Sequence, residues 1–300
     1  MRIGIEIETH VPRSVAVGSW STGRNNTNLE GWTACSDSTI HPPRGSGRRG
    51  CEFKLTRPLQ LIEANLEKIA KDVRYMKDVL DANVNASCGL HIHIEWNSND
   101  LKKLRRLVHT VAHYEEAFFG VTGTKKRKVG RWSRSIKSSH QHINYRRGRR
   151  SMGLYNNIAH SLNGDRYKVL NLQPLLNGRR NAVEFRVFAG TLNVNKIIGA
   201  ICMCAGVVES CLGRTSTPKW NAPTEDRDSY RASGEAELTL TRLFYRLGWW
   251  PKKSRKGVDE LIKASENGLD VPTLKTIKKT MIEMCKKYDA ASRRASRRTA

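Results

Sequence analysis

Four short segments alternate apolar and polar residues, and this pattern constrains the fold more than any other feature of the chain. The segments are residues 2–9, 52–56, 89–96 and 182–189. Successive side chains of an extended strand point to opposite faces, so each segment has one apolar face and one polar face. This pattern predicts the core strands of a sheet that buries one face and leaves the other open to polar groups.

Apolar residues at three-and-four spacing predict three helices after or between these strands, at 60–81, 99–119 and 195–212. The second follows Ser98-Asn99-Asp100, a cluster that favours helix capping. Residues 18–50 are rich in Gly, Ser, Asn and Pro and are predicted to be mostly loop. A connection of that length indicates a functional segment.

The sequence predicts a boundary near residues 215–230. It separates a catalytic core, 1–215, from a helical and basic C-terminal region, 216–300, with a disordered end. The helices expected in this second region span 235–248, 256–266 and 271–290.

The N-terminus has no signal-peptide pattern, and no run of eighteen apolar residues occurs, so no membrane span is expected. The seven cysteines are odd in number and lack zinc-type pair spacing. We therefore expect reduced thiols and a cytoplasmic location.

The chain is strongly basic, with 53 Lys and Arg against 28 Asp and Glu, a formal net charge of +25. Two regions hold much of the excess: residues 117–164, which contain no acidic residue, and the last fifty residues. One interpretation is a solvated loop and tail, and the other is contact with nucleic acid or another polyanion. Composition does not choose between them.

The polar faces of the predicted strands carry an unusual set of groups. If the strands are neighbours, four carboxylates, two imidazoles and a guanidinium share one face, which is repulsive unless cations neutralise it. Oxygen ligands with an imidazole suit Mg²⁺ or Mn²⁺ better than Zn²⁺. An ordinary solvated face is the alternative. The residues are Glu6, Glu8, Glu52, His91, His93, Glu184 and Arg186.

Several ordered motifs between residues 3 and about 200 resemble the amidoligase family, carboxylate-amine ligases that share the glutamine synthetase fold. The motifs are Gly4-Ile5-Glu6-Ile7-Glu8-Thr9, Asp37-Ser38, Gly50-Cys51-Glu52-Phe53 with Pro58-Leu59, Cys88-Gly89-Leu90-His91-Ile92-His93-Ile94, Arg166-Tyr167 through Leu170-Asn171-Leu172, and Val183-Glu184-Phe185-Arg186-Val187 through Asn193. The chain departs from the pattern at Ser38-Thr39, where a Gly commonly follows the Asp, and in residues 54–58. Both departures concern substrate choice.

The resemblance implies an α+β fold with a curved, mainly antiparallel sheet of glutamine synthetase-like type, packed helices, and a concave face that holds ATP and Mg²⁺, with Mn²⁺ as a substitute. It also implies roles for the polar-face residues. Glu6, His91 and Glu184 would hold a metal between the ATP phosphates, and Glu8 and Glu52 a metal near the acceptor carboxylate. His93 would lie near the phosphates, Arg186 would brace the transferred phosphoryl group, and Asp37 would bind metal or the amine.

The basic segment suggests further anion ligands, and Arg131, Arg134 and Arg166 are expected to hold phosphate or substrate carboxylates. Together these inferences predict an ATP- and Mg-dependent ligase that forms an amide or isopeptide bond through an acyl phosphate. Its substrates would be the carboxylates and amines of amino acids, peptides or protein side chains. The alternative is a nucleic-acid-binding or metal-dependent nucleic-acid-processing protein, suggested by the net charge and the carboxylate cluster.

Overall fold

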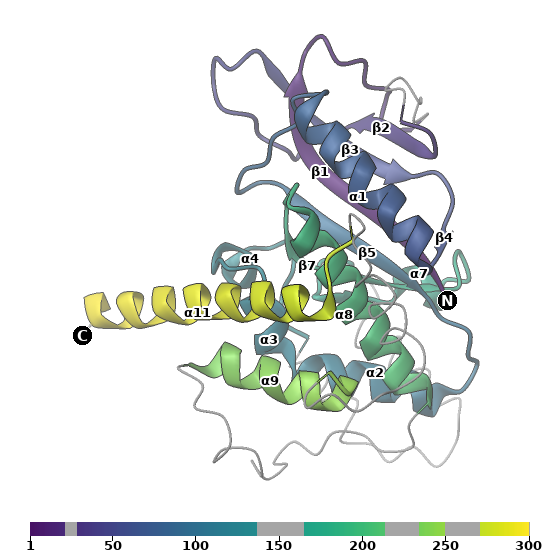
Figure 1. Cartoon of the computed structure of the whole chain (residues 1–300), viewed down its shortest axis with the longest axis vertical. Helices are drawn as coiled ribbons and strands as arrows, with labels where there is room; N and C mark the ends of the chain where they lie inside the picture. Colours follow the sequence, from purple (N-terminus) through teal and green to yellow (C-terminus); the bar gives the residue numbers. More distant parts are fainter. Residues whose placement is uncertain (22–28, 137–164, 214–233, 250–270, 300) are drawn as a thin grey trace.

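A computed structural model describes residues 1–21, 29–136, 165–213, 234–249 and 271–299 (Figure 1). Within them, one seven-stranded sheet runs in the order β2-β3-β1-β5-β7-β6, and β4 pairs with the start of β1. Every pairing among these strands is antiparallel. The strands are β1 (Arg2–Pro12), β2 (Trp32–Ser36), β3 (Arg48–Leu55), β4 (Leu59–Gln60), β5 (Gly89–Glu95), β6 (Leu170–Asn171) and β7 (Ala182–Ala189).

The four predicted strands are confirmed as β1, β3, β5 and β7, and they are consecutive neighbours in the sheet. Their apolar faces form the core: Ile3, Ile5, Ile7, Cys51, Phe53, Leu90, Ile92, Ile94, Val183 and Phe185 are almost fully buried. The predicted combination of an antiparallel sheet with several packed helices is therefore confirmed. Its assignment to the glutamine synthetase-like type stays a prediction.

The pairing of β5 with β7 is irregular, which the alternation alone did not predict. Leu90 pairs with Phe188 and Ile92 with Phe185, so β7 has one residue more than β5 in this stretch. Such a β-bulge locally changes which way successive side chains point. It lets both Val187 and Phe188 enter the core while Glu184 and Arg186 stay on the polar face.

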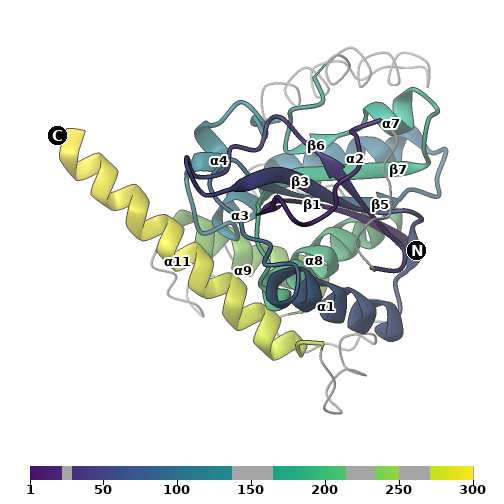
Figure 2. The same ribbon diagram turned by 90° about the horizontal axis from the view of Figure 1, so that it is seen from above.

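The long helices α1 and α8 cover the apolar face of the sheet, and the short helix α7 lies on the other side of it (Figure 2). Helix α8 packs against β5, α1 and α2. The bounds of these helices and of one further short helix, α4, are α1 (Glu63–Asp78), α2 (Leu101–His113), α4 (Lys126–Val129), α7 (Gln173–Leu176) and α8 (Val194–Gly213).

Two of the three helix predictions are confirmed by α1 and α8, but the predicted helix 99–119 is interrupted. It divides at Tyr114 into α2 and α3 (Glu115–Gly120). Asp100 caps α2 as expected, because its side chain accepts a hydrogen bond of 2.8 Å from the backbone N–H of Lys102. The break allows Glu115 to bind the backbone N–H of Ile136 at 2.7 Å, which anchors the following segment.

Helix α8 is long and apolar enough to cross a membrane by length and composition alone. Most of its residues are buried inside the protein, as in the central helix of a packed core. Its apolar character is accounted for by its contacts with β5 and the neighbouring helices.

The prediction that residues 18–50 are mostly loop is confirmed for the described part of this range, but β2 and the start of β3 interrupt the loop. β2 forms because its five residues pair with β3, and Trp32 is buried with its indole N–H donating to Asp72 of α1 at 2.7 Å. These are contacts across the fold, which a short and mixed segment does not display in its own sequence.

The C-terminal region contains α9 (Glu235–Leu247) and α11 (Leu274–Thr299), which matches two of the three helices expected there. The predicted helix 256–266 lies outside the described residues. The chain end was expected to be disordered, but α11 is helical to Thr299. Ala and Arg are good helix formers, and a helix extends readily from a packed first part.

Helices α9 and α11 pack on each other, and α11 also packs on α3 and α8. The N-cap of α9 is Gly234, which has no side chain to cap the helix. Asp289 of α11 replaces it, accepting hydrogen bonds of 3.1 Å from the backbone N–H groups of Ala236 and Glu237. A Cβ at Gly234 would overlap this carboxyl group, so the glycine makes the contact possible.

Replacing Asp289 with Ala should therefore destabilise the protein by about 1–2 kcal/mol, because two helix N–H groups lose their partner. The measurement is urea unfolding followed by circular dichroism. Glu283→Ala, at an exposed position of the same helix, is the control and should change stability by less than about 0.5 kcal/mol. Equal effects of the two substitutions would contradict the capping role.

Candidate active site

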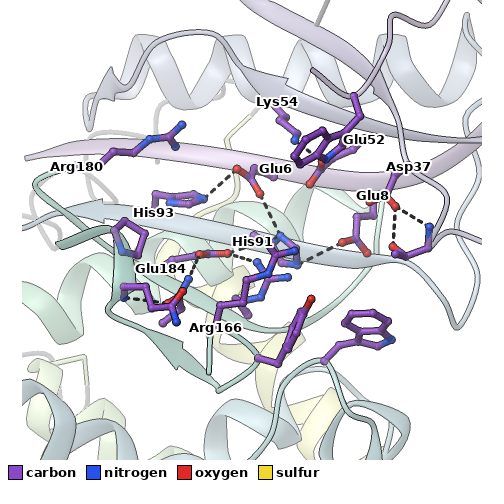
Figure 3. A pocket seen from close by; sticks show the side chains of 18 of the residues that line it. Glu6, Glu8, Asp37, Glu52, Lys54, His91, His93, Arg166, Arg180 and Glu184 are labelled. Carbon is purple, nitrogen blue, oxygen red and sulfur yellow. Dashed lines mark hydrogen bonds and ion pairs between the residues drawn. The ribbon is translucent and has the colours of Figure 1, made fainter. Parts of the chain in front are cut away.

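The polar face of the sheet forms the floor of a pocket of about 560 Å³. Figure 3 shows charged side chains from β1, β3, β5 and β7 converging on this space. Nine of the residues predicted from the sequence line it: Glu6, Glu8, Asp37, Glu52, His91, His93, Arg166, Glu184 and Arg186. The volume lies within the range of about 300–1,000 Å³ that is usual for small-molecule sites.

His91 lies at the centre of the carboxylates. Its Nδ1 is 3.2 Å from Glu6 Oε2 and 3.8 Å from Glu184 Oε1, and its Nε2 is 3.4 Å from Glu8 Oε1. The register explains this placement, because Glu6 is directly opposite His91 across the β1–β5 pair. His91 is 3 % exposed, so its contacts with these carboxylates lie largely out of reach of water.

The same residues fall into two groups that could each hold a metal ion. Ligand atoms of Glu6, His91 and Glu184 lie within 4.8 Å of one another, and so do those of Glu8, Glu52 and His91. The two groups share His91, which offers a different ring nitrogen to the carboxylates on each side. The geometry thus brings the oxygen-rich donor sets expected for Mg²⁺ side by side.

The carboxylate of Glu184 accepts hydrogen bonds from two side chains, one on β6 and one on β7. Asn171 of β6 donates to Glu184 Oε2 at 2.6 Å, and Arg186 Nη1 donates to Glu184 Oε1 at 2.5 Å. Asn171 faces Glu184 directly in the β6–β7 pair. These two contacts fix the carboxylate of Glu184, and Arg186 also lines the pocket.

Burial and neighbouring charges shift the pKa values of these carboxyl groups in opposite directions. Burial disfavours ionisation of Glu6, but hydrogen bonds from His91 and His93 outweigh it and hold the pKa of Glu6 well below its usual value. Burial, and then the charge of Glu6, raise the pKa of Glu52 to about 7, against the opposing effect of Lys54. One carboxylate of this face is thus only partly ionised at neutral pH.

Asp37 lies in the loop after β2, at the opposite end of the pocket from Arg180 (Figure 3). Its Oδ1 accepts hydrogen bonds of 2.7 Å from both the backbone N–H and the hydroxyl of Thr39. The loop packs closely on β3 at Gly50, where a Cβ would overlap the Asp37 carbonyl oxygen. Glycine at position 50 therefore lets Asp37 reach the pocket.

The structure places the three expected anion-binding arginines differently. Arg166 lines the pocket, but Arg134 and Arg131 do not. Arg134 forms an ion pair of 2.8 Å with Asp165, and the Arg131 guanidinium lies 4.3 Å from the centre of the Trp132 ring. A local acidic partner and a neighbouring ring satisfy these two side chains away from the pocket.

Other lining residues were not identified from the sequence, chief among them Arg127. This buried side chain donates from Nη2 to the carbonyl oxygen of Arg186 at 2.8 Å, so it supports the bulged part of β7. Its position beside Glu8 depends on Gly89, where a Cβ would lie 2.8 Å from Arg127 Nη2. The remaining unpredicted lining residues include Lys54, Asn171, Arg179, Arg180, Trp20, Trp132 and Tyr167.

Comparisons with known proteins agree with the motifs that lie in this pocket. A family model described as "putative amidoligase enzyme" matches residues 1–208. The match covers all seven strands and the whole of the pocket lining. No curated protein matches the chain.

The raised pKa of Glu52 leads to a prediction about stability. Between its ordinary value of 4.5 and about 7, the native state binds this proton more tightly than the unfolded chain does. The free energy of unfolding therefore falls as pH rises through this window. Because Gln cannot ionise, Glu52→Gln should stabilise the protein at pH 8 by roughly 1–3 kcal/mol and give little benefit near pH 4.5.

The measurement is urea unfolding at both pH values with a chelator present, so that no divalent cation offsets the charge. The matched control is Glu95→Gln, whose wild-type carboxylate pairs with Arg2 at 2.6 Å outside the pocket lining. Hydrogen bonds and the charge of Arg2 outweigh burial and lower the pKa of Glu95, so this variant should gain no stability at pH 8. A Glu52→Gln variant no more stable than wild type at pH 8 would contradict the prediction.

Proposed function

The chain belongs to the amidoligase enzyme family, and on that basis we propose that it is an ATP- and Mg²⁺-dependent carboxylate-amine ligase. The observation that carries the proposal is the presence of two clusters of carboxylates on either side of His91. Both clusters lie in one pocket with Arg186. Ligase chemistry with ATP needs cations beside phosphate oxygens and a second polar site for the acceptor. This pocket offers groups suited to both.

The residues present fit Mg²⁺ or Mn²⁺. Two clusters rich in carboxylate oxygen, with only one imidazole between them, are hard donor sets that suit these ions. Glu6, His91 and Glu184 would hold one ion, and Glu8 and Glu52 another. When bound, the ions would supply positive charge that lowers the repulsion between a nucleophile and phosphate oxygens.

Side chains around the pocket suggest where the nucleotide lies. Arg186 and His93 are on the floor beside Glu184, and three exposed arginines line the pocket further out. Guanidinium groups match the geometry of phosphate oxygens and can bind them through paired hydrogen bonds. We assign this side of the pocket to the ATP phosphates; the three outer arginines are Arg166, Arg179 and Arg180.

The proposed reaction has two steps. An oxygen of the acceptor carboxylate attacks the γ-phosphorus of ATP, the bond to the β–γ bridging oxygen breaks, and ADP leaves. The amine nitrogen then attacks the carbonyl carbon of the acyl phosphate, inorganic phosphate leaves, and the nitrogen loses a proton. Arg186 is placed to stabilise the negative charge of the transferred phosphoryl group, and His93 to hold phosphate oxygens.

The opposite side of the pocket is where we place the acceptor and the amine. Asp37 gives that side negative charge suited to an ammonium group, whereas Lys54, paired with Glu52 at 2.5 Å, offers a cation to a carboxylate. Hydroxyl groups of Ser36, Ser38, Thr39 and Ser87 also line the pocket. Amino acids, peptides and protein side chains carry both of the required groups.

The cytoplasm is the compartment we propose for this activity, since ATP and Mg²⁺ are abundant there. The seven cysteines are free and buried, in keeping with a reducing environment.

Loss of the central carboxylates should abolish the activity. Glu6→Gln and Glu184→Gln are each expected to reduce ADP release by at least about a hundredfold, because each removes a ligand charge next to His91. The assay supplies ATP, Mg²⁺ and a pool of amino acids, dicarboxylates, polyamines and short peptides. Glu95→Gln, on β5 but outside the pocket lining, should keep wild-type activity.

ADP release that needs no carboxylate, or that survives in Glu6→Gln, would argue against a ligase. An absence of release from the wild type, together with an absence of thermal stabilisation by ATP, would count against the proposal as a whole.

Two of the three arginines that were predicted to bind anions, Arg166 and Arg134, should differ in nucleotide binding. Arg166→Gln should weaken ATP binding by roughly tenfold through loss of a charged hydrogen bond. Arg134→Gln should leave the affinity unchanged, because Arg134 is bound to Asp165 outside the pocket lining. Isothermal titration with a non-hydrolysable ATP analogue measures both, and equal losses would refute the assignment of Arg166.

A further inference from the structure

Helix α11 presents one strongly basic face to solvent. Its exposed cationic side chains recur along one side of the helix, within about 120° of one another at 3.6 residues per turn. From the first to the last they extend over about 28 Å at 1.5 Å per residue. These residues, called here the basic face of α11, are Lys275, Lys279, Lys286, Lys287, Arg293 and Arg294.

We propose that the basic face of α11 binds the phosphate backbone of double-stranded nucleic acid. A linear row of cations on a straight helix matches the regularly spaced charges of a duplex backbone. This interaction would be separate from the ligase chemistry, since none of the six side chains lines the pocket.

One side chain of the row has an acidic partner from another helix, because Lys286 lies 3.7 Å from Glu237 of α9. Within α11 itself, little negative charge compensates the row. The helix contains two acidic residues, and one of them, Asp289, is buried as the cap of α9. The other, Glu283, is exposed between the two halves of the row. The face thus keeps a large excess of positive charge where a polyanion can reach it.

A neighbouring lysine increases this positive charge. Lys196, at the start of α8, has a pKa below its usual value, first because of burial and second because of the charge of Lys287. Like charges held near each other oppose folding unless an anion comes between them. Lys196 therefore adds a further positive charge in the neighbourhood of Lys287.

The opposite face of α11 argues against a membrane as the partner. Helices that lie in a lipid interface expose an apolar face to the acyl chains. The large apolar residues of α11 are instead turned into the protein core; Leu274, Ile277, Met281, Met284, Cys285 and Tyr288 are each at most 9 % exposed.

Single strands also fit less well. Proteins that bind them use exposed aromatic side chains on which bases stack. The one aromatic residue of α11 is Tyr288, and it is 2 % exposed. A surface that has cations but no exposed aromatic rings contacts phosphates and not bases. The regularly spaced phosphates of a duplex backbone therefore suit this surface better than a single strand does.

The direction of α11 makes the face accessible. Both views show the C-terminal part of the helix extending away from the body of the protein (Figures 1 and 2). The helical backbone continues to Thr299. A duplex could therefore approach this side without contacting the sheet.

The test is binding of the full-length protein to a labelled 24-base-pair duplex, measured by fluorescence anisotropy over a range of salt concentrations. Binding should weaken steeply with salt, with a slope of about −0.9 for each phosphate contacted. A variant with Lys286, Lys287, Arg293 and Arg294 changed to Gln should bind roughly tenfold or more weakly at 0.1 M salt. Its slope should be smaller by about three to four.

A charge-matched variant separates this surface from net charge alone. Arg44, Lys71, Lys77 and Lys102 are exposed basic residues outside α11, and changing them to Gln removes the same charge. This variant should bind the duplex within about threefold of wild type, because backbone binding depends on local contacts. Circular dichroism melting curves of both variants confirm that each is folded, and nucleotide-dependent stabilisation should persist in both.

Three results would overturn the proposal: no duplex binding at 50 mM salt, equal losses in the two variants, or tighter binding to a single strand of the same length. Stronger binding to vesicles of anionic lipid or to a polyglutamate peptide than to the duplex would assign the face to another partner and also overturn it. Because ligase activity is assayed separately, failure here would leave the proposed reaction untouched.

Discussion

The arrangement depends on one constraint: several carboxylates share a largely buried sheet face, where their mutual repulsion must be offset by neighbouring groups. Two histidines lie among these carboxylates: His91 lies between Glu6, Glu8 and Glu184, and His93 Nε2 is 3.3 Å from Glu6. The strands can present these groups only because their other faces are apolar and packed beneath α8. The core and the site are thus two sides of the same strands.

This coupling explains why much of the fold and the site could be predicted from the sequence. Alternation identifies a strand and also divides its residues between the two faces, so finding Ile3, Ile5 and Ile7 in the core fixes Glu6 and Glu8 opposite them. The same logic held for β3, β5 and β7. Within a regular strand, the alternation in the sequence therefore predicts which side chains are buried and which face the pocket.

Prediction failed where position depends on contacts between distant segments. β2 has no clear alternation and forms because β3 and Asp72 hold it. Arg127 and Arg134 lie in one basic run, yet the first reaches the carbonyl of Arg186 and the second binds Asp165. In a run of basic residues, the local sequence does not show which arginine is buried in the structure and which forms an exposed ion pair. The bulge in β7 belongs to the same class, since it is a property of the strand pair.

The contacts between α11 and the rest of the protein give the basic C-terminal region a defined position. If the helix were only a solvated tail, it would not need Asp289 to cap α9 or Tyr288 to pack beside Glu116. These contacts hold the first part of α11 in a fixed direction, so its exposed cations keep a constant spacing. A rigid row loses less conformational entropy on binding than a flexible tail of the same charge. The fold therefore turns charge that composition alone left ambiguous into a surface of defined geometry.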